Sequence, residues 1–267
     1  MAGECKVFFA RNLQELFYQK KTISGLSIVG ACTHISHLPE KSISSTLIPE
    51  LTNIEKHERF IEFGPGVTLG RVLGIGEHHI PQVIYNALKT ISNPFVRNCA
   101  TIGGNICAGP QRLTLFSPLL ALDAKLELKS PFETHCISLQ NFTEIEKDFV
   151  LTKIRVPLSH WDIELYSRLG PAGQITEDSG GFTFLMSFEK GVITNIRIAF
   201  AGSITFRCTA LENRLLGLRL PINTKEIDIY LNEAESQFIY AEEGRTPNKL
   251  LRSQFKNLMR TSLEQLT

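Results

Sequence analysis

The pentapeptide Thr101-Ile102-Gly103-Gly104-Asn105 has the composition of a phosphate-binding turn. Gly103 and Gly104 carry no side chains, so another molecule can approach their main chain closely. Their N–H groups can then point together at a diphosphate, while Thr101 and Asn105 add a hydroxyl and an amide at the two ends. A tight turn that requires positive φ explains the same two glycines. Glycine spacing alone favours the tight turn, so the surrounding sequence has to decide.

A second candidate loop follows a short strand near the N-terminus. Residues 26–30 read as a buried strand, and residues 6–10 are β-prone. Between them, Asn12 and Glu15 have the spacing of an N-cap and its reciprocal acid, which predicts a helix to about Lys20. Such a β-α-β start predicts a small parallel sheet. Ligands of parallel sheets tend to bind at the carboxyl ends of the strands, which is where residues 30–35 lie.

The stretch from about residue 57 to 157 alternates like an antiparallel sheet with short helices. Residues 60–63, 125–128 and 150–156 are predicted strands, and Thr68 is a possible cap of a short helix. A clearer helix is expected after Pro81, because one apolar stripe recurs there at helical spacing. That stripe consists of Val83, Ile84, Ala87, Leu88 and Ile91.

The last hundred residues predict a hairpin and helices. Residues 182–188 and 192–200 read as two strands joined by a short turn. Thr209 and Glu212 have capping-box spacing, and Gly217 should end the helix that they begin. A final helix is expected from Pro247, with a basic row on one face. That row, Lys249, Arg252, Lys256 and Arg260, is interpreted as a solvated face, with a partner interface as the alternative.

Composition excludes several functional classes. The net charge of +1 gives no field for nucleic acid, and no apolar run is long enough to cross a bilayer. The N-terminus lacks the pattern of a signal peptide, so we expect a cytoplasmic protein. Six cysteines include no C-x-x-C pair, so neither a zinc site nor an iron–sulfur cluster of the chain's own is expected.

Other motifs fail on spacing. Residues 64–70 read G-P-G-V-T-L-G, which is one residue longer than the dinucleotide-binding motif G-x-G-x-x-G. The sequence contains no P-loop motif and no G-x-S-x-G elbow. His78 and His79 are adjacent and have no suitably spaced acid, so no metal site is expected. No residue stands out as a catalytic acid, base or nucleophile.

The wider sequence changes the interpretation of the glycine pair. Residues 96–107 read V-R-N-C-A-T-I-G-G-N-I-C, which resembles the flavin-binding signature of the molybdopterin dehydrogenase FAD-binding family. That family includes the flavin subunits of xanthine dehydrogenase and carbon monoxide dehydrogenase. Weaker similarities follow in order along the chain, at residues 46–51, 61–69, 118–126, 191–202 and 212–217.

The resemblance implies an α+β fold with two parts. Residues 1–157 would form a two-lobed FAD-binding domain of the PCMH type. Its first lobe, to about residue 56, would be a small parallel β-α-β unit, and its second, residues 57–157, mainly antiparallel. Residues 161–267 would form a C-terminal domain of antiparallel sheet with helices.

The resemblance also implies FAD, held in a cleft between the two N-terminal lobes. The implied cofactor-binding residues are Gly30, Ala31, Cys32, Thr33, His34, Ile35, Thr101, Ile102, Gly103, Gly104, Asn105, Thr114 and Arg168. Three positions depart from the family pattern. Ala31 and Cys32 stand where two glycines are usual, and Thr114 stands about where an aspartate binds the ribose. Arg168 keeps the charge of a usual lysine.

The implied function is electron transfer. Electrons would arrive from a 2Fe-2S ferredoxin-like subunit and leave to NAD or another acceptor, while a large molybdopterin-binding subunit would bind the substrate. One alternative is a structural or assembly subunit of the same fold with weakened or lost FAD binding, which Ala31, Cys32 and Thr114 favour. A self-contained flavin reductase of the cell-wall precursor type fits the C-terminal segment less well.

Overall fold

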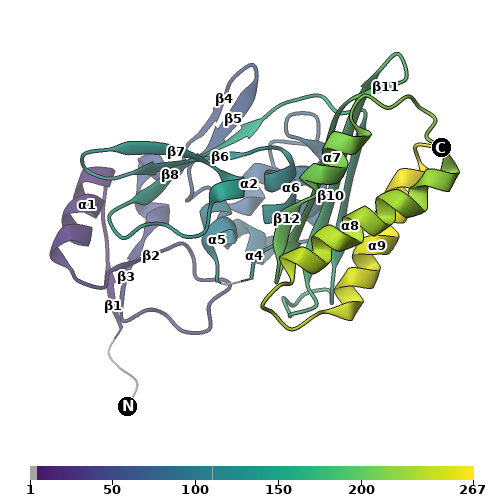
Figure 1. Ribbon diagram of the computed structural model, residues 1–267. Coiled ribbons are helices and arrows are strands. Elements are labelled where there is room, and N and C mark those ends of the chain that lie inside the picture. The colour runs from purple at the N-terminus through teal and green to yellow at the C-terminus, as the bar shows by residue number, and fades with distance from the viewer. Residues whose placement is uncertain (1–4, 110) are drawn as a thin grey trace. The chain divides into compact units, whose positions relative to one another are not determined.

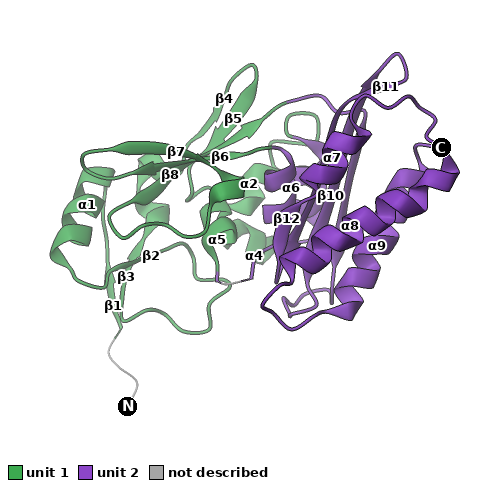
Figure 2. Cartoon of the chain, in the orientation of Figure 1, with its two compact units in different colours: residues 1–80, 92–108, 123–158 green, residues 81–91, 109–122, 159–267 purple. Residues whose placement is uncertain are grey.

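The computed structural model describes residues 5–109 and 111–267 of the 267-residue chain (Figure 1). By packing, the chain divides into two compact units (Figure 2). Unit 1 comprises residues 1–80, 92–108 and 123–158, and unit 2 comprises residues 81–91, 109–122 and 159–267. No helix in the described ranges is both long and apolar enough to span a membrane.

The first lobe of unit 1 is the expected parallel β-α-β arrangement. Strands β1 and β2 both pair in parallel with the central β3, and α1 connects β1 to β2. Asn12 caps α1 by accepting the Glu15 N–H at 2.8 Å, as the sequence predicts. The bounds are β1 Lys6–Phe8, α1 Leu13–Thr22, β2 Ser27–Val29, β3 Lys41–Ser44, and the 3-10 turns η1 Ser45–Leu47 and η2 Pro49–Leu51.

The second lobe of unit 1 is an antiparallel five-stranded sheet in the order β4-β5-β8-β6-β7. Thr68 caps α2, as expected, by accepting the Arg71 N–H. The bounds are β4 Ile54–Lys56, β5 Phe60–Phe63, α2 Leu69–Leu73, α4 Pro94–Cys99, α5 Ile102–Cys107, β6 Lys125–Lys129, β7 Thr134–Ser138, η3 Leu139–Asn141 and β8 Val150–Pro157.

Unit 2 is an antiparallel sheet in the order β12-β11-β10-β9, with two long helices on one face (Figure 2). The β10–β11 hairpin turns at Lys190 and Gly191, both with positive φ, as a two-residue hairpin turn requires. The bounds are α3 Gln82–Lys89, α6 Phe116–Ala121, β9 Ile163–Leu169, β10 Gly180–Glu189, β11 Val192–Gly202, β12 Thr205–Arg207, α7 Thr209–Leu215, η4 Thr224–Glu226, α8 Ile227–Ala241 and α9 Lys249–Glu264.

Side-chain alternation along β10 explains why earlier segments pack in unit 2. Phe182 and Phe184 face the core under α8 and α9, where each fully buried aromatic ring contributes roughly 1.5–3 kcal/mol. Thr183 points the other way and its hydroxyl bonds Ser117 of α6 at 2.6 Å. Segments 81–91 and 109–122 therefore belong to unit 2, although they precede the boundary near residue 158 that the sequence predicts.

Three of the four residues in the basic row of α9 form ion pairs within the protein. Arg252 pairs with Glu242, Lys256 with Glu235, and Arg260 with Asp228 at 2.9 Å. All three acids lie on or directly after α8. The row therefore ties the two helices together, which the sequence of α9 alone cannot indicate.

Two caps differ from expectation. Glu212 does not close a capping box with Thr209, because its carboxylate accepts the Ile198 N–H and binds the Arg207 guanidinium. The last helix begins at Lys249 rather than Pro247, and Asn248 caps it by accepting the Leu251 N–H at 3.0 Å.

Candidate functional site

The glycine pair lies in the first turn of a helix and not in a tight turn. Helix α5 begins at Ile102, and Thr101 caps it by accepting the Gly104 N–H on Oγ1 at 3.1 Å. Neither Gly103 nor Gly104 has positive φ. The interpretation as a turn that requires positive φ is therefore wrong, and so is the assignment of this segment to a loop.

The amides of the glycine pair already have acceptors. The Gly103 N–H donates to the Pro65 carbonyl at 2.9 Å, and Thr101 accepts the Gly104 N–H. The Ile102 N–H donates to the Val67 carbonyl, also at 2.9 Å. The expected grip of a diphosphate by the Gly103 and Gly104 amides is therefore corrected: the Gly103 amide holds α5 against Pro65, and the Gly104 amide is satisfied by the cap of its own helix.

Gly103 is required by packing. A Cβ at this position would lie 2.5 Å from the Pro65 Cβ and 2.7 Å from its carbonyl oxygen, closer than atoms can approach. Gly104 differs, because it is exposed and its nearest neighbour would be Thr101 Oγ1 at 3.0 Å. Only Gly104 of the pair therefore presents an open main-chain surface.

The loop at residues 30–35 meets this helix within unit 1. A Cβ on Gly30 would lie 2.8 Å from Thr101 Oγ1, so the two segments approach as closely as a glycine allows. Between the two lobes of unit 1 lies a cavity of about 100 Å³ that both segments line. Its walls include Val29, Gly30, Ser45, Pro65, Thr101, Gly103, Gly104, Cys107 and Leu151.

The same loop carries the unused donors. Ala31, Thr33, His34 and Ile35 are exposed. Among the residues that the structure describes, none accepts a hydrogen bond from the main-chain N–H groups of residues 31–35. A run of free amides next to a glycine-lined cavity is the donor set that an anionic group such as a diphosphate requires.

Cys32 is the strained residue of this loop. Its φ is +55°, in the left-handed region where a side chain is disfavoured and glycine is not. Its Sγ lies 3.9 Å from the Gly30 carbonyl oxygen, and its side chain is partly buried. The backbone therefore adopts here the conformation that a glycine would favour, and a cysteine occupies it.

Two expected site residues belong to unit 2. Thr114 precedes α6, and its carbonyl accepts the Tyr166 hydroxyl at 3.5 Å. The Arg168 guanidinium donates to the carbonyls of Pro171 and Gln174, both at 2.8 Å. Burial raises the pKa of the Tyr166 hydroxyl above its ordinary value. The loop at residues 30–35 and the helix start at residues 101–105 come together in unit 1, whereas Thr114 and Arg168 are placed only within unit 2.

Pro65 lines the cavity, although residues 64–66 were not predicted to belong to the site. Residues 64–66 fail as a Rossmann motif, yet a Cβ on Gly64 would lie 2.3 Å from the Leu51 carbonyl oxygen. The Pro65 carbonyl accepts the hydrogen bond from the Gly103 N–H. The sequence signal for this packing is the pair of glycines that flank Pro65, because glycines of this kind indicate close backbone packing as readily as they indicate a ligand.

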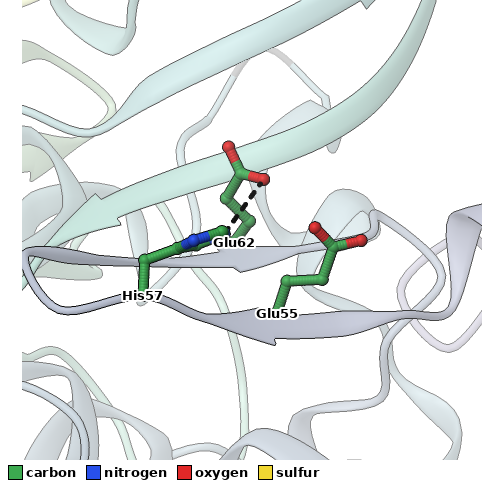
Figure 3. Close-up of side chains that lie close together, drawn as sticks. All are labelled: Glu55, His57 and Glu62. Atoms are coloured by element: carbon green, nitrogen blue, oxygen red, sulfur yellow. Dashed lines mark ion pairs between the residues drawn. The ribbon is translucent and has the colours of Figure 1, made fainter.

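A second cluster contains Glu55 of β4, Glu62 of β5 and His57 in the turn between these strands (Figure 3). The buried Glu62 carboxylate already binds Lys153 Nζ and Arg155 Nη2, each at 2.7 Å. Burial alone would raise the pKa of Glu62, but the hydrogen bonds and charges of these two cations outweigh it and lower that pKa. We assign the cluster to sheet stability, because the two cations neutralise the carboxylate that a metal would need.

Comparison with known proteins decides the family. The family model described as the FAD binding domain in molybdopterin dehydrogenase matches residues 5–159. The chain belongs to this family. The resemblance based on residues 96–107 is thereby confirmed, as is FAD as the cofactor of the family.

Curated relatives share part of their length with this chain. The xanthine dehydrogenase FAD-binding subunit of Escherichia coli O157:H7 is 28% identical over 163 residues, covering 53% of this chain and 56% of that protein. Abscisic-aldehyde oxidase of Arabidopsis thaliana is 30% identical over 146 residues, covering 52% of this chain and 11% of that one. The chain thus matches only a tenth to about half of these relatives.

Solved structures share the fold over the whole chain. A reconstituted CO dehydrogenase from Oligotropha carboxidovorans has a TM-score of 0.84 at 17% identity, covering 100% of this chain and 98% of that one. Quinoline 2-oxidoreductase from Pseudomonas putida 86 gives 0.79 at 16% identity, with 98% and 96% coverage. The expected α+β fold, with a parallel lobe, an antiparallel lobe and a C-terminal sheet with helices, is confirmed.

Proposed function

We propose that this chain is the FAD-binding electron-transfer subunit of a xanthine dehydrogenase-like molybdenum hydroxylase. Family membership supports the cofactor and the enzyme class. One observation of the structure carries the site: the main-chain amides of residues 31–35 have no acceptor among the described residues, and they follow directly on Gly30, which lines a cavity together with Gly103 and Gly104. Bound FAD would supply the redox chemistry that no side chain of this protein provides.

The roles of the site residues follow from their surroundings. The amides of residues 31–35 would bind the diphosphate, since they are exposed and without acceptors. Residues 101–105 would form the rigid wall, with Gly104 as its open surface. Thr114 and Arg168 belong to unit 2, and their expected roles at the ribose and the flavin stay predictions of the family resemblance.

The proposal requires partner subunits. The sequence holds no C-x-x-C pair and no cysteine spacing typical of an iron–sulfur cluster. Electrons would therefore arrive from a 2Fe-2S ferredoxin-like subunit, and a large molybdopterin-binding subunit would carry the substrate. NAD or another acceptor would take the electrons onward.

A second candidate has its own support. Cys32 holds a left-handed conformation in the very loop that would receive the diphosphate, and its Cβ adds bulk where the family usually has glycine. Such a chain could keep the fold and act as a structural or assembly subunit with weakened or lost FAD binding. The two candidates differ in cofactor content.

The deciding experiment measures flavin in the protein isolated from its native source and after reconstitution with FAD. Stoichiometric flavin absorbance supports the electron-transfer subunit, whereas a colourless protein that takes up no FAD supports the structural one. Gly104→Val should lose FAD, because Gly104 is exposed at the cavity wall and a valine side chain would project there, with its Cβ 3.0 Å from Thr101 Oγ1. Gly104→Ala is the graded control.

The partners are tested separately. Native-level expression followed by affinity capture should recover a ferredoxin-like chain and a large molybdenum-containing chain. Recovery of this chain by itself, in repeated captures under mild conditions, would contradict the proposed assembly while leaving the cofactor result untouched.

A further inference from the structure

Unit 1 contains a larger hollow that the flavin site does not use. Its volume is about 590 Å³, within the range of small-molecule sites. Its lining comes from three segments: the end of α1 with the residues that follow it, the turn between β6 and β7, and residues 147–149. We call it the Lys20 pocket. It shares no lining residue with the cavity beside Gly104.

Aromatic side chains supply the apolar surface of the Lys20 pocket. Phe17 lies on α1, and Phe149 is 8% exposed, stacked on the His135 ring with centroids 4.6 Å apart. Phe132, at the hairpin turn, is 90% exposed. A fixed aromatic wall with a bare phenyl ring beside it offers a flat ligand two surfaces to contact.

The charge of the pocket is positive. Lys20, Lys21 and Lys147 line it, against two acids. Glu133 lies 3.0 Å from His135 Nε2, so its carboxylate has a neighbour on the protein. Within the described part of the chain, Lys21 and Lys147 pair with no carboxylate. The pocket therefore has more cationic groups than its own acids neutralise.

Lys20 is the ammonium that a ligand would meet inside the pocket. It is partly buried, and the one acceptor recorded for it among the described residues is the Phe149 carbonyl at 3.0 Å. Burial lowers the pKa of Lys20, and the charge of Asp148 opposes this effect. The Lys20 ammonium has three N–H groups and is incompletely solvated. An anionic acceptor, in addition to the Phe149 carbonyl, would therefore stabilise its charge.

We propose that the Lys20 pocket binds a small aromatic carboxylate, with the ring beside Phe149 and Phe132 and the carboxylate on Lys20. The volume of the pocket fits a small molecule, its aromatic lining fits the ring, and its unneutralised lysines fit the carboxylate. A neutral aromatic molecule would leave the ammonium as it is, and a small inorganic anion would leave Phe132 uncovered.

The test uses the full chain saturated with FAD, so that any flavin site is occupied. Calorimetric titration with 2-naphthoate should show saturable binding of one molecule per chain. The neutral analogue 2-naphthylmethanol should bind at least about tenfold more weakly, because it forms no charge-assisted hydrogen bond. Equal affinity for the two compounds would overturn the proposal, as would the absence of saturable naphthoate binding.

Variants locate the binding. Lys20→Met should weaken naphthoate at least about tenfold, while Lys225→Met, in η4 of unit 2, should leave it unchanged. Phe132→Ala should weaken it about fivefold and keeps the test valid if Lys20→Met fails to fold, since an exposed ring contributes little to the core. Naphthoate binding that survives both pocket variants but disappears in Gly104→Val would assign the ligand to the flavin site and overturn the proposal.

Discussion

The loop at residues 30–35 and the N-terminus of α5, which meet at the small cavity of unit 1, differ in how their main chains are used. At residues 101–105 the amides donate to Val67, Pro65 and Thr101. At residues 31–35 the amides are exposed and have no acceptor in the described protein. The segment that is most recognisable in the sequence is therefore occupied with holding the fold. The segment that departs from the family pattern offers the groups that a ligand can use.

This contrast has a physical basis. A helix N-terminus leaves amides without partners, and Thr101 together with residues 65–67 satisfies them, which makes α5 a rigid wall. An exposed loop can leave its amides to water until an anion replaces it. We therefore expect stability to depend on the first of these segments and ligand access on the second.

Gly103→Ala should have the largest effect. Its Cβ would overlap Pro65, so we expect a loss of about 3 kcal/mol in the free energy of unfolding. Chemical denaturation measures the change. Gly104→Ala is the matched control and should stay within about 1 kcal/mol of the wild type, because alanine is favoured over glycine in a helix. Equal losses in the two variants would contradict the assignment of Gly103 to packing.

Thr101→Ala should be next. Removal of the hydroxyl leaves the Gly104 amide without its acceptor, which costs about 1–2 kcal/mol of stability. Thr101→Ser retains the hydroxyl and should lose less than about 0.5 kcal/mol. Thermal melting of the three proteins distinguishes these outcomes. If the serine variant loses as much stability as the alanine variant, the Thr101 methyl group, and not the capping hydroxyl, makes the important contact.

Cys32→Gly should act in the opposite direction. Glycine removes the left-handed strain, and its larger unfolded-state entropy offsets part of this gain, leaving a net stabilisation of about 0.5–1 kcal/mol. FAD uptake should increase in the same variant if the Cβ obstructs the diphosphate. Cys32→Ala keeps a Cβ and should change neither property. A gain in the alanine variant would make the thiol, rather than the backbone, responsible.

Glu62→Gln should have the smallest effect, about 0.5 kcal/mol, because Lys153 and Arg155 are substantially exposed. Since the pKa of Glu62 is lowered, the stability that the carboxylate contributes is present above the ordinary carboxyl range and is lost as pH falls through the lowered pKa. Acid titration of stability should show this loss in the wild type and a smaller one in Glu62→Gln. Glu55→Gln, on an exposed side chain, should resemble the wild type.

Pro65 links the Glu62 ion pairs to the N-terminus of α5, because its carbonyl accepts the Gly103 N–H. Glu62 lies on β5, three residues before the proline that packs against Gly103. Loss of its ion pairs should therefore increase hydrogen exchange at residues 101–105 but leave residues 31–35 unchanged, because these amides are already open. Faster exchange at residues 31–35 would show that this loop and the N-terminus of α5 are not independent.

Local sequence rules predicted many elements because their signals lie within a few residues. Asn12 and Thr68 cap the helices that they were expected to cap, and the hairpin at Lys190 and Gly191 turns where expected. Glu212 failed as a capping residue because Arg207 and the Ile198 amide, which lie outside the motif, bind its carboxylate more directly. A charged side chain close to both a cation and a free amide favours these partners over a local cap.

The sequence by itself determined the family, many of the elements and the presence of two glycine-bearing segments, because motif letters and hydrophobic periodicity are properties of the chain. It did not predict β3, α4 or α5. Only the tertiary structure decided what each glycine does. Whether an amide is free depends on which carbonyl another segment brings to it, as Pro65 does for Gly103. For the same reason only the fold could show that the basic row of α9 pairs with α8, and that three lysines and three aromatic rings surround one hollow.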